Sequence, residues 1–334
     1  MSSSDLTKPN RRTAIRSLAA LAAAGAMPFP ANAQQDFPNR PIALVIPYAA
    51  GGGNDVMGRI VADKMSQTLG QQVVVENRGG AGGSIATRQV AHAAPDGYTL
   101  VLGGTGTLAV NPSLYANVGY DPRKDFAPVG MIGTGALIVI AHPSVPAKTI
   151  PELIALAKKE PGKLSYASAG VGSGIHLGAV LFEMMADIKL THVPYKGTGP
   201  ALNDLVGGHV QLYFSSIPSA IGLVKNGQVR ALAVTGTKRS PIFPDVPTVE
   251  ETGLKGYETV LRYGIVAPAG TPKPIIAKLN AALRQAVESP DTRERMAKDG
   301  TEPHASTPEE YAADIDREET KWSAIVKRSG AKVQ

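Results

Sequence analysis

The chain has 334 residues, 34 Lys and Arg against 28 Asp and Glu, a formal net charge of +6, and no cysteine. The lack of cysteine excludes disulfide bonds, thiolate metal ligands, a cysteine nucleophile and a lipid-modified N-terminal cysteine. This length exceeds what one hydrophobic core usually supports, so we expect two domains, and no clustered basic segment indicates nucleic-acid binding.

Residues 1–33 have the pattern of an export signal. Arg11 and Arg12 precede an Ala/Leu-rich run too short to span a bilayer, and a small-x-small sequence ends at Ala33. The paired arginines favour the twin-arginine pathway, and an amphipathic first helix of the folded protein fits their position poorly. Removing this segment lowers the formal charge from +6 to +3. No later segment is apolar for long enough to cross a membrane, so we expect a soluble protein in a Gram-negative periplasm.

Hydrophobic periodicity predicts a first α/β segment. We expect Asn54 to cap its first helix and Gly70 to end that helix. A β-α-β-α-β order implies a parallel sheet that binds ligands at the carboxyl ends of its strands. The expected strands are residues 41–46, 72–76 and 98–102, and the expected helices are residues 55–69 and 84–94.

Two long apolar runs, residues 126–142 and 257–268, are predicted to cross between two lobes. A second α/β set lies between them, with helices at 150–159, 175–186, 200–206 and 219–225 and strands at 164–167, 190–194, 210–214 and 229–235. The tail adds helices at 273–289, 293–298 and 308–328. We therefore assign residues 34–135 and 256–334 to domain 1, residues 136–255 to domain 2, and the ligand cleft to the space between them.

Two stretches share one motif, in which a strand is followed by a glycine-rich turn and a helix. They are Ile46-Pro-Tyr-Ala-Ala-Gly-Gly-Gly-Asn-Asp55 and Ser165-Tyr-Ala-Ser-Ala-Gly-Val-Gly-Ser-Gly-Ile-His176. The first turn of a helix leaves N–H groups without partners, its dipole is positive there, and glycine lets a ligand approach the main chain. Each turn therefore favours an anion, above all a carboxylate or phosphate.

Two other motifs indicate a function less clearly. Residues 104–109 match the dinucleotide pattern G-x-G-x-x-A, but Pro112 should interrupt the helix that would receive a pyrophosphate. This loop either lines the cleft or only turns the chain. Residues 170–174 lack the G-x-S-x-G frame, and Ser173 as a helix N-cap with His176 in the first turn explains this pair without Ser–His catalysis.

Polar residues in two further turns leave both roles open. Lys196, in the loop from Pro194 to Pro200, is either solvated or faces the cleft. The hydroxyl groups after Phe214 either cap the next helix or contact ligand. Because the scattered histidines have no metal-ligand spacing, we expect neither a metal nor a cofactor.

The chain resembles the tripartite tricarboxylate transporter receptors, also called Bug-type extracytoplasmic solute receptors. The resemblance extends over essentially the whole chain after the export signal. The matching stretches include Gln72-Val-Val-Val-Glu-Asn-Arg-Gly-Gly-Ala-Gly-Gly83, Val193-Pro-Tyr-Lys-Gly-Thr-Gly-Pro-Ala-Leu202, and residues 41–55, 94–100, 230–235, 244–249 and 267–272.

The resemblance implies a two-lobed periplasmic binding protein of type II-like α/β fold. Each lobe would have a mainly parallel sheet flanked by helices, and the lobes would close around a small carboxylate. The protein, expected to be a monomer, would deliver this ligand to integral-membrane permease subunits. Carried over by position, the ligand site would comprise Tyr48, Gly52, Gly53, Asn54, Thr105 and Thr107 in the first lobe, and Ser168, Gly170, Gly172, Ser173, His176, Lys196, Gly197, Thr198 and Ser215 in the second.

Two departures from the family pattern concern charge. Ser215 stands where many relatives have Asp, and Arg262-Tyr263 stands where many have an aromatic pair. Losing a carboxylate and gaining a guanidinium both favour a more anionic ligand, so we expect a dicarboxylate whose second carboxylate binds Arg262. The alternative is that Arg262 points to solvent or pairs with a surface acid such as Glu258.

Three functions fit this sequence. The leading one is a transport receptor that does no chemistry on its ligand. The second is a carboxylate sensor for a membrane signalling partner, and the third is an exported enzyme that processes carboxylates in the same cleft.

Overall fold

The computed structural model describes residues 37–329, so the predicted export signal lies outside the described residues. The first lobe begins with three parallel strands, with β1 in the middle. They are β1 (Ile42–Ile46), β2 (Val73–Asn77) and β3 (Thr99–Gly104). The helical segments that follow them are α2 (Gly53–Leu69), the 3₁₀ turn η3 (Ala81–Gly83), α3 (Ser84–Ala91), the π-helical turn η4 (Thr105–Val110) and α4 (Asn111–Leu114).

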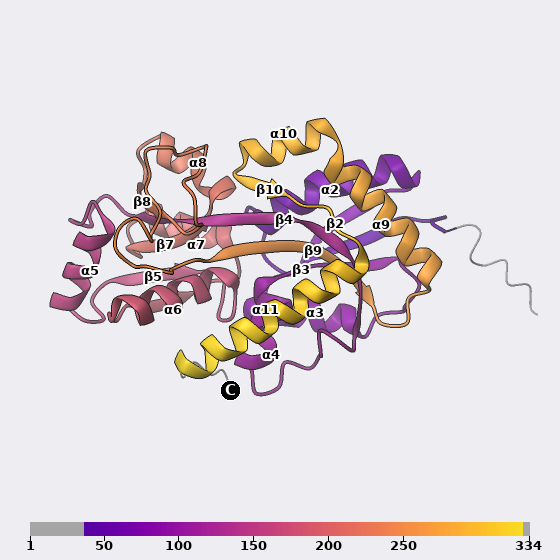
Figure 1. Ribbon diagram of the computed structural model, residues 1–334, viewed down its shortest axis with the longest axis horizontal. Coiled ribbons are helices and arrows are strands. Elements are labelled where there is room, and N and C mark those ends of the chain that lie inside the picture. Colours follow the sequence, from indigo (N-terminus) through magenta and orange to yellow (C-terminus); the bar gives the residue numbers. More distant parts are fainter. Residues whose placement is uncertain (1–36, 330–334) are drawn as a thin grey trace, which may run out of the picture. The chain divides into compact units, whose positions relative to one another are not determined.

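Two antiparallel strands connect the lobes, as the sequence predicted. They are β4 (Phe126–Ala141) and β9 (Val260–Pro268), and they run side by side through the middle of Figure 1. The part of β4 up to Ala136 pairs with β9, and the part from Leu137 onward pairs with strands of the second lobe. The sheet is therefore continuous through β4.

The second lobe repeats the α/β pattern. Its strands β5, β6 and β7 are parallel, while β7 and β8 pair antiparallel with β4. The strands are β5 (Ser165–Ser168), β6 (Thr191–Pro194), β7 (Leu212–Ser216) and β8 (Arg230–Val234). The helices are α5 (Ile150–Lys159), α6 (Gly174–Ala186), α7 (Thr198–Val206) and α8 (Ile217–Lys225).

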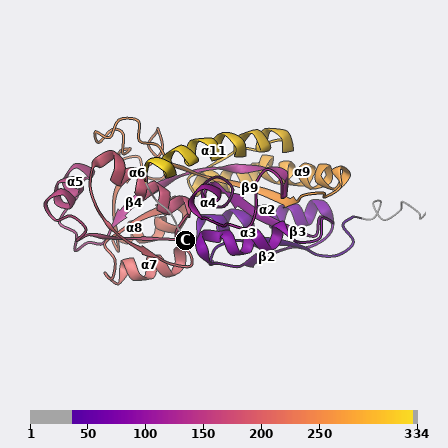
Figure 2. The same ribbon diagram turned by 90° about the horizontal axis from the view of Figure 1, so that it is seen from below.

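The C-terminal part of the chain returns to the first lobe and then reaches the second. It consists of α9 (Lys273–Glu288), α10 (Pro290–Lys298), the short strand β10 (Thr301–Pro303) and α11 (Pro308–Ser329). Helix α11 extends from beside β9 toward α6 in both views (Figures 1 and 2). There Trp322 packs with Leu177 of α6 and Leu114 of α4 in one buried cluster.

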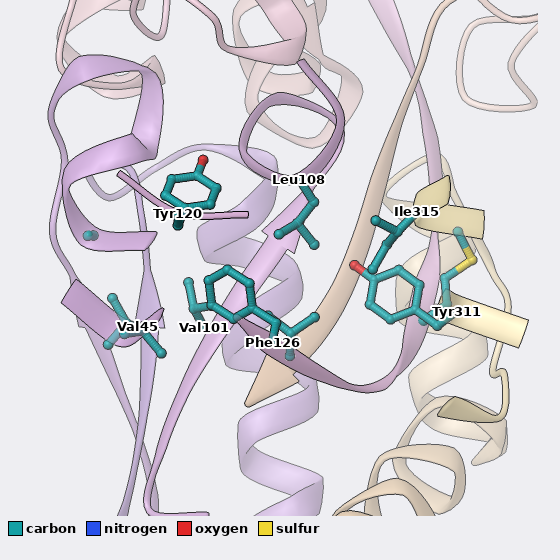
Figure 3. Packing of buried hydrophobic residues seen from close by; sticks show 11 residues of the cluster. Val45, Val101, Leu108, Tyr120, Phe126, Tyr311 and Ile315 are labelled. Atoms are coloured by element: carbon teal, nitrogen blue, oxygen red, sulfur yellow. The ribbon is translucent and has the colours of Figure 1, made fainter. Parts of the chain in front are cut away.

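The main core of the first lobe lies between its sheet and α11. Val45, Val101 and Phe126 from three strands pack with Tyr311 and Ile315 from α11 (Figure 3). Tyr120 meets Phe126 edge to face, with ring centroids 5.9 Å apart, an arrangement that aromatic pairs prefer. This core holds the strands whose carboxyl ends carry the loops of the site.

The structure corrects several predicted boundaries. Gly52, with an extended backbone and no side-chain cap, precedes α2, so Asn54 lies inside the helix and is not its N-cap. Helix α3 ends at Ala91 and not at residue 94. Pro112 does not interrupt a helix, because it occupies the first turn of α4, where its missing N–H costs nothing. Strand β10 was not predicted.

By its internal contacts, the chain from Pro38 onward forms one compact unit. The domain boundaries at residues 135/136 and 255/256 therefore stay a prediction. The continuity of the sheet through β4 and the contacts between the two sets of loops, described below, account for this single unit.

Replacing Phe126 with alanine should lower the free energy of unfolding by about 3–5 kcal/mol, because the large ring leaves a cavity in a close-packed core. Urea unfolding with an unchanged m-value measures this loss. Val74→Ala is the control, since Val74 is 44% exposed and the change should stay within about 0.5 kcal/mol. Equal losses in the two variants would contradict the assigned core.

Candidate functional site

The loops at the carboxyl ends of the parallel strands meet between the lobes and enclose one cavity of about 30 Å³, which we call the interlobe cavity. This volume is close to the space that one water molecule takes up in the liquid. The first lobe and β9 contribute Tyr48, Gly52, Gly53, Asn54, Gly104, Thr105, Gly106, Leu261 and Arg262. The second lobe contributes Ala169, Ser173, Gly174, Ile175 and Thr198.

The two sets of loops approach at main-chain distance. A Cβ on Gly197 would lie 2.6 Å from the Cβ of Ala49, and one on Gly106 would lie 2.9 Å from the carbonyl oxygen of Gly172. Hydrogen bonds cross the gap: the Ala49 N–H donates to the Lys196 carbonyl over 3.2 Å, and the Ser219 hydroxyl donates to the Gly51 carbonyl over 2.8 Å. At Gly106 and Gly197, a side chain would collide with the opposite lobe, so only glycine allows the two main chains to come this close.

Three helix N-termini line the interlobe cavity. They belong to α2, at Gly53 and Asn54, to α6, at Gly174 and Ile175, and to α7, at Thr198. No side chain caps α2 or α7. First-turn N–H groups have no acceptor within their helix and carry the positive end of the helix dipole. The cavity walls therefore favour an anion.

A buried carboxylate shapes the first glycine loop. Asp55 accepts hydrogen bonds from the Gly51 N–H over 3.1 Å and from Nε of Arg59 over 3.0 Å. Burial by itself would raise the pKa of Asp55, but these two donors, together with the Asn77 side chain and the charge of Arg59, outweigh it and lower the pKa below its usual range. Asp55 therefore stays ionised, and Arg59 balances its charge.

Arg262 requires a correction. Its Nε lies 3.0 Å from Oδ2 of Asp314 and its Nη2 lies 3.1 Å from Oε1 of Glu318, both on α11. The Arg262 side chain is 19% exposed, so it neither points to solvent nor pairs with Glu258. Although Arg262 lines the cavity, its charge is balanced within the protein. It no longer supports the expectation of a second ligand carboxylate.

His176 and Ser168 lie behind the cavity wall and not in it. Nδ1 of His176 accepts the Gly172 N–H over 3.3 Å. The Ser168 hydroxyl accepts the Gly170 N–H over 3.1 Å and bonds to Nε2 of His192 over 2.6 Å. The predicted capping also occurs, because the Ser173 hydroxyl accepts the His176 N–H over 3.2 Å.

The other predicted site residues divide into three groups. Gly170 and Lys196 line a neighbouring groove at the edge of the lobe contact. Thr107 and Ser215 are buried and bonded locally, with the Thr107 hydroxyl accepting the Gly104 N–H and the Ser215 hydroxyl donating to the Ser216 carbonyl. Gly172 and Gly197 carry the lobe contact described above. The structure thus brings together Tyr48, Gly52, Gly53, Asn54, Thr105, Ser173, Thr198 and Arg262.

Sequence reasoning missed six residues that line the cavity: Gly104, Gly106, Ala169, Gly174 and the two large apolar residues Ile175 and Leu261. Nothing in the type of the last two marks them, since both also fit a buried core. Among residues 37–329, no three His, Cys, Asp or Glu side chains group as metal ligands. Within the same range, no helix has the length and apolar character needed to span a membrane.

Replacing Arg262 with alanine should lower the free energy of unfolding by about 3 kcal/mol, because Glu318 would remain buried without a counter-charge, while Asp314 would keep only its ion pair with Arg317. Chemical denaturation measures the loss. Arg239→Ala is the matched control, because its ion pair with Glu251 is nearly half exposed and should contribute less than about 1 kcal/mol. Similar small losses in both variants would show that the Arg262 pairs do not stabilise the fold.

The buried histidines should make the fold acid-sensitive. Burial, with a smaller effect of the neighbouring His192 charge, lowers the pKa of His176 to about 3, and burial lowers that of His192 to about 4. Both folded-state values lie below the unfolded value of 6.5. The unfolded chain therefore binds more protons below this pH, and stability falls as the pH decreases.

Between pH 6.5 and 5, we expect His176 to cost up to about 1.4 kcal/mol of unfolding free energy per pH unit. Tyr166 stacks on His192 and Glu183 is the acid beside Tyr166. Because both buried imidazoles are absent from a His176→Asn, His192→Gln variant, its unfolding free energy should change less with pH across this range than that of the exposed-site control His92→Gln. An unchanged slope in the double variant would refute the assignment.

The comparisons with known proteins agree with this geometry. Residues 57–331 match the family described as the tripartite tricarboxylate transporter family receptor. Protein BugT of Bordetella pertussis is 37% identical over 299 residues, which cover 89% of this chain and 92% of BugT.

Solved structures share the fold. The periplasmic binding protein BugD is 40% identical, with a TM-score of 0.86 over 89% of this chain and all of BugD. Rpa4515 of R. palustris, solved with adipate, is 35% identical, with a TM-score of 0.86 over 89% of this chain and all of its own. MatC of Rhodopseudomonas palustris, solved with bound malate, is 37% identical, with a TM-score of 0.84 over 87% of this chain and all of MatC.

These matches confirm the predicted two-lobed α/β fold and the resemblance read from the sequence. The family consists of substrate-binding receptors and not of enzymes. Since both the sequence match and the structural match span most of the chain, this protein belongs to the tripartite tricarboxylate transporter receptor family.

Proposed function

We propose that this receptor binds a small carboxylate, with a dicarboxylate preferred, in the interlobe cavity and delivers it to the membrane permease subunits of a tripartite tricarboxylate transporter. One observation carries the proposal: helix N-termini from both lobes, those of α2, α6 and α7, line the same cavity. First-turn N–H groups and the helix dipole suit a carboxylate without a charged partner side chain.

The charges around the cavity support this reading. Arg59 balances Asp55, and Arg262 is engaged by two acids of α11. The Thr105 hydroxyl is bonded to the main chain of Val260 and Arg262. Main-chain N–H groups and the hydroxyl hydrogens of Ser173 and Thr198, whose oxygens accept from His176 and Tyr213, are then available to meet a ligand. We assign ligand contact to these groups together with Tyr48, Gly52, Gly53 and Asn54.

The cavity volume argues for movement of the lobes. The cavity is small, about 30 Å³, and the main chains of the two lobes touch beside it. A dicarboxylate therefore enters while the lobes stand apart, and the lobes close until their walls meet the ligand. A ligand that contacts both lobes shifts the balance toward the closed form, because only that form offers all three helix N-termini at once.

The solved relatives support the ligand class. Rpa4515 and MatC were solved with adipate and malate, which are both dicarboxylates. The preference proposed here rests on these relatives and not on Arg262. Family membership, together with the export signal read from the sequence, supports a monomeric receptor in the periplasm, with its cleft between residues 34–135 plus 256–334 and residues 136–255.

Binding of malate and adipate to the chain without residues 1–33 tests the proposal. Calorimetry should show saturable binding, and the melting temperature should rise with ligand by mass action. Asn54→Ala should weaken binding by about 1–2 kcal/mol, roughly 5- to 30-fold, without loss of stability, because alanine is the better helix former. Mass spectrometry should show the ligand chemically unchanged.

Gln67→Ala is the matched control, since it removes an exposed side-chain amide from the same helix, away from the interlobe cavity. Equal affinity of the two variants would exclude Asn54 from the site. Absence of binding across a panel of mono- and dicarboxylates would refute the proposed ligand class. A receptor-deletion strain that still imports the ligand at the normal rate would refute delivery to the permease.

A further inference from the structure

The backbone of the loop from Ala169 to Ser173 adopts conformations that favour glycine. It connects β5 to α6, and two of its residues, Gly170 with φ +120° and Gly172 with φ +84°, lie in the left-handed region. Its two ends, Ala169 and Ser173, line the interlobe cavity. Any displacement of this loop would therefore move one wall of the proposed ligand site.

The same loop also makes the contact with the first lobe. The Val171 carbonyl accepts a hydrogen bond from the Tyr115 hydroxyl over 2.8 Å. A Cβ on Gly172 would lie 2.1 Å from Oδ1 of Asn111. The position of the loop thus decides both the shape of the cavity and how closely the lobes meet.

Side chains behind the loop accept the N–H groups of both left-handed glycines. Nδ1 of His176 accepts from Gly172, and the Ser168 hydroxyl accepts from Gly170. The imidazoles of His176 and His192 stack with their centroids 4.2 Å apart. His176 is 6% exposed. Each left-handed glycine is therefore held by a polar side chain that does not line the cavity.

This arrangement requires a particular state of His176. To accept the Gly172 N–H, Nδ1 must carry no proton, so the ring is the neutral tautomer with hydrogen on Nε2. Burial lowers the pKa of His176 to about 3, which keeps the ring neutral at ordinary pH.

We propose that His176 is a positioning residue of the ligand site, which fixes the Gly172 end of the loop by accepting its N–H and does not touch the ligand. Ser168, oriented by His192, fixes the Gly170 end in the same way. The inference rests on the proposed function, because the loop is argued to be one wall of the carboxylate site. It replaces the expectation that His176 contacts the ligand.

Two substitutions of His176 distinguish a hydrogen-bonding role in holding the loop from a role in packing alone. His176→Asn keeps an acceptor oxygen near the place of Nδ1, whereas His176→Leu fills similar space without an acceptor. In the ligand-free protein, hydrogen exchange of the Gly172 amide should rise at least about 10-fold in the Leu variant and stay near the wild-type rate in the Asn variant. Affinity for malate or adipate should fall in parallel, at least about 10-fold for Leu and less than about 3-fold for Asn.

A substitution at Ser168 tests the other end of the loop if the His176→Leu variant does not fold. Ser168→Ala should speed exchange at Gly170 and leave Gly172 protected. The exposed-site variant His92→Leu is the control and should change neither exchange nor affinity.

Several results would overturn the proposal. They are a Gly172 amide that exchanges freely in the wild type, an Asn variant as impaired as the Leu variant, or a Leu variant that exchanges fast at Gly172 yet binds ligand with wild-type affinity. If the wild type binds no carboxylate, the proposed function fails instead, and the exchange rates, which need no ligand, still decide whether His176 holds the loop.

Discussion

The contact between the two lobes depends on the close approach of their main chains across the cleft. A Cβ on Gly82 would lie 1.9 Å from the Val171 carbonyl oxygen, and one on Gly79 would lie 2.5 Å from the Lys196 carbonyl oxygen. Because no side chain intervenes at these contacts, helix N-termini of both lobes reach one small cavity. The many glycines of the loops are thus explained by distance as well as by backbone angle.

The charged residues near this cavity have structural partners. Asp55 holds the Gly51 N–H and pairs with Arg59, and Arg262 pairs with Asp314 and Glu318. A cavity without an unbalanced cation would select the proposed ligand by geometry and by hydrogen bonds from the main chain. This property suits a family whose solved members hold different dicarboxylates, since few side-chain types need to change with the ligand.

Helix α11 contacts elements of both lobes. Through Arg262 it holds β9, and through Trp322, whose Nε1 donates to Glu318 over 3.2 Å, it joins the cluster that contains Leu177 of α6. The helix therefore contacts a connecting strand and a helix of the second lobe at once (Figure 2). We infer that it limits how far the lobes separate, because wide opening would expose this cluster to water.

The sequence by itself determined most helices and strands, their order and the two connecting strands, because hydrophobic period and glycine turns are local signals. It also predicted that the two glycine loops form an anion site, because a strand, turn and helix in succession dictate where N–H groups point, and ligand binding there stays a prediction. It did not predict the short elements η3, η4, α4 and β10. Only the tertiary structure decided the partners of His176, Ser215 and Arg262. Asp314 lies 52 residues from Arg262 in the chain, and even the nearby partners of His176 and Ser215, which are Gly172 and Ser216, depend on how the loops fold, so residue type alone does not identify the partner.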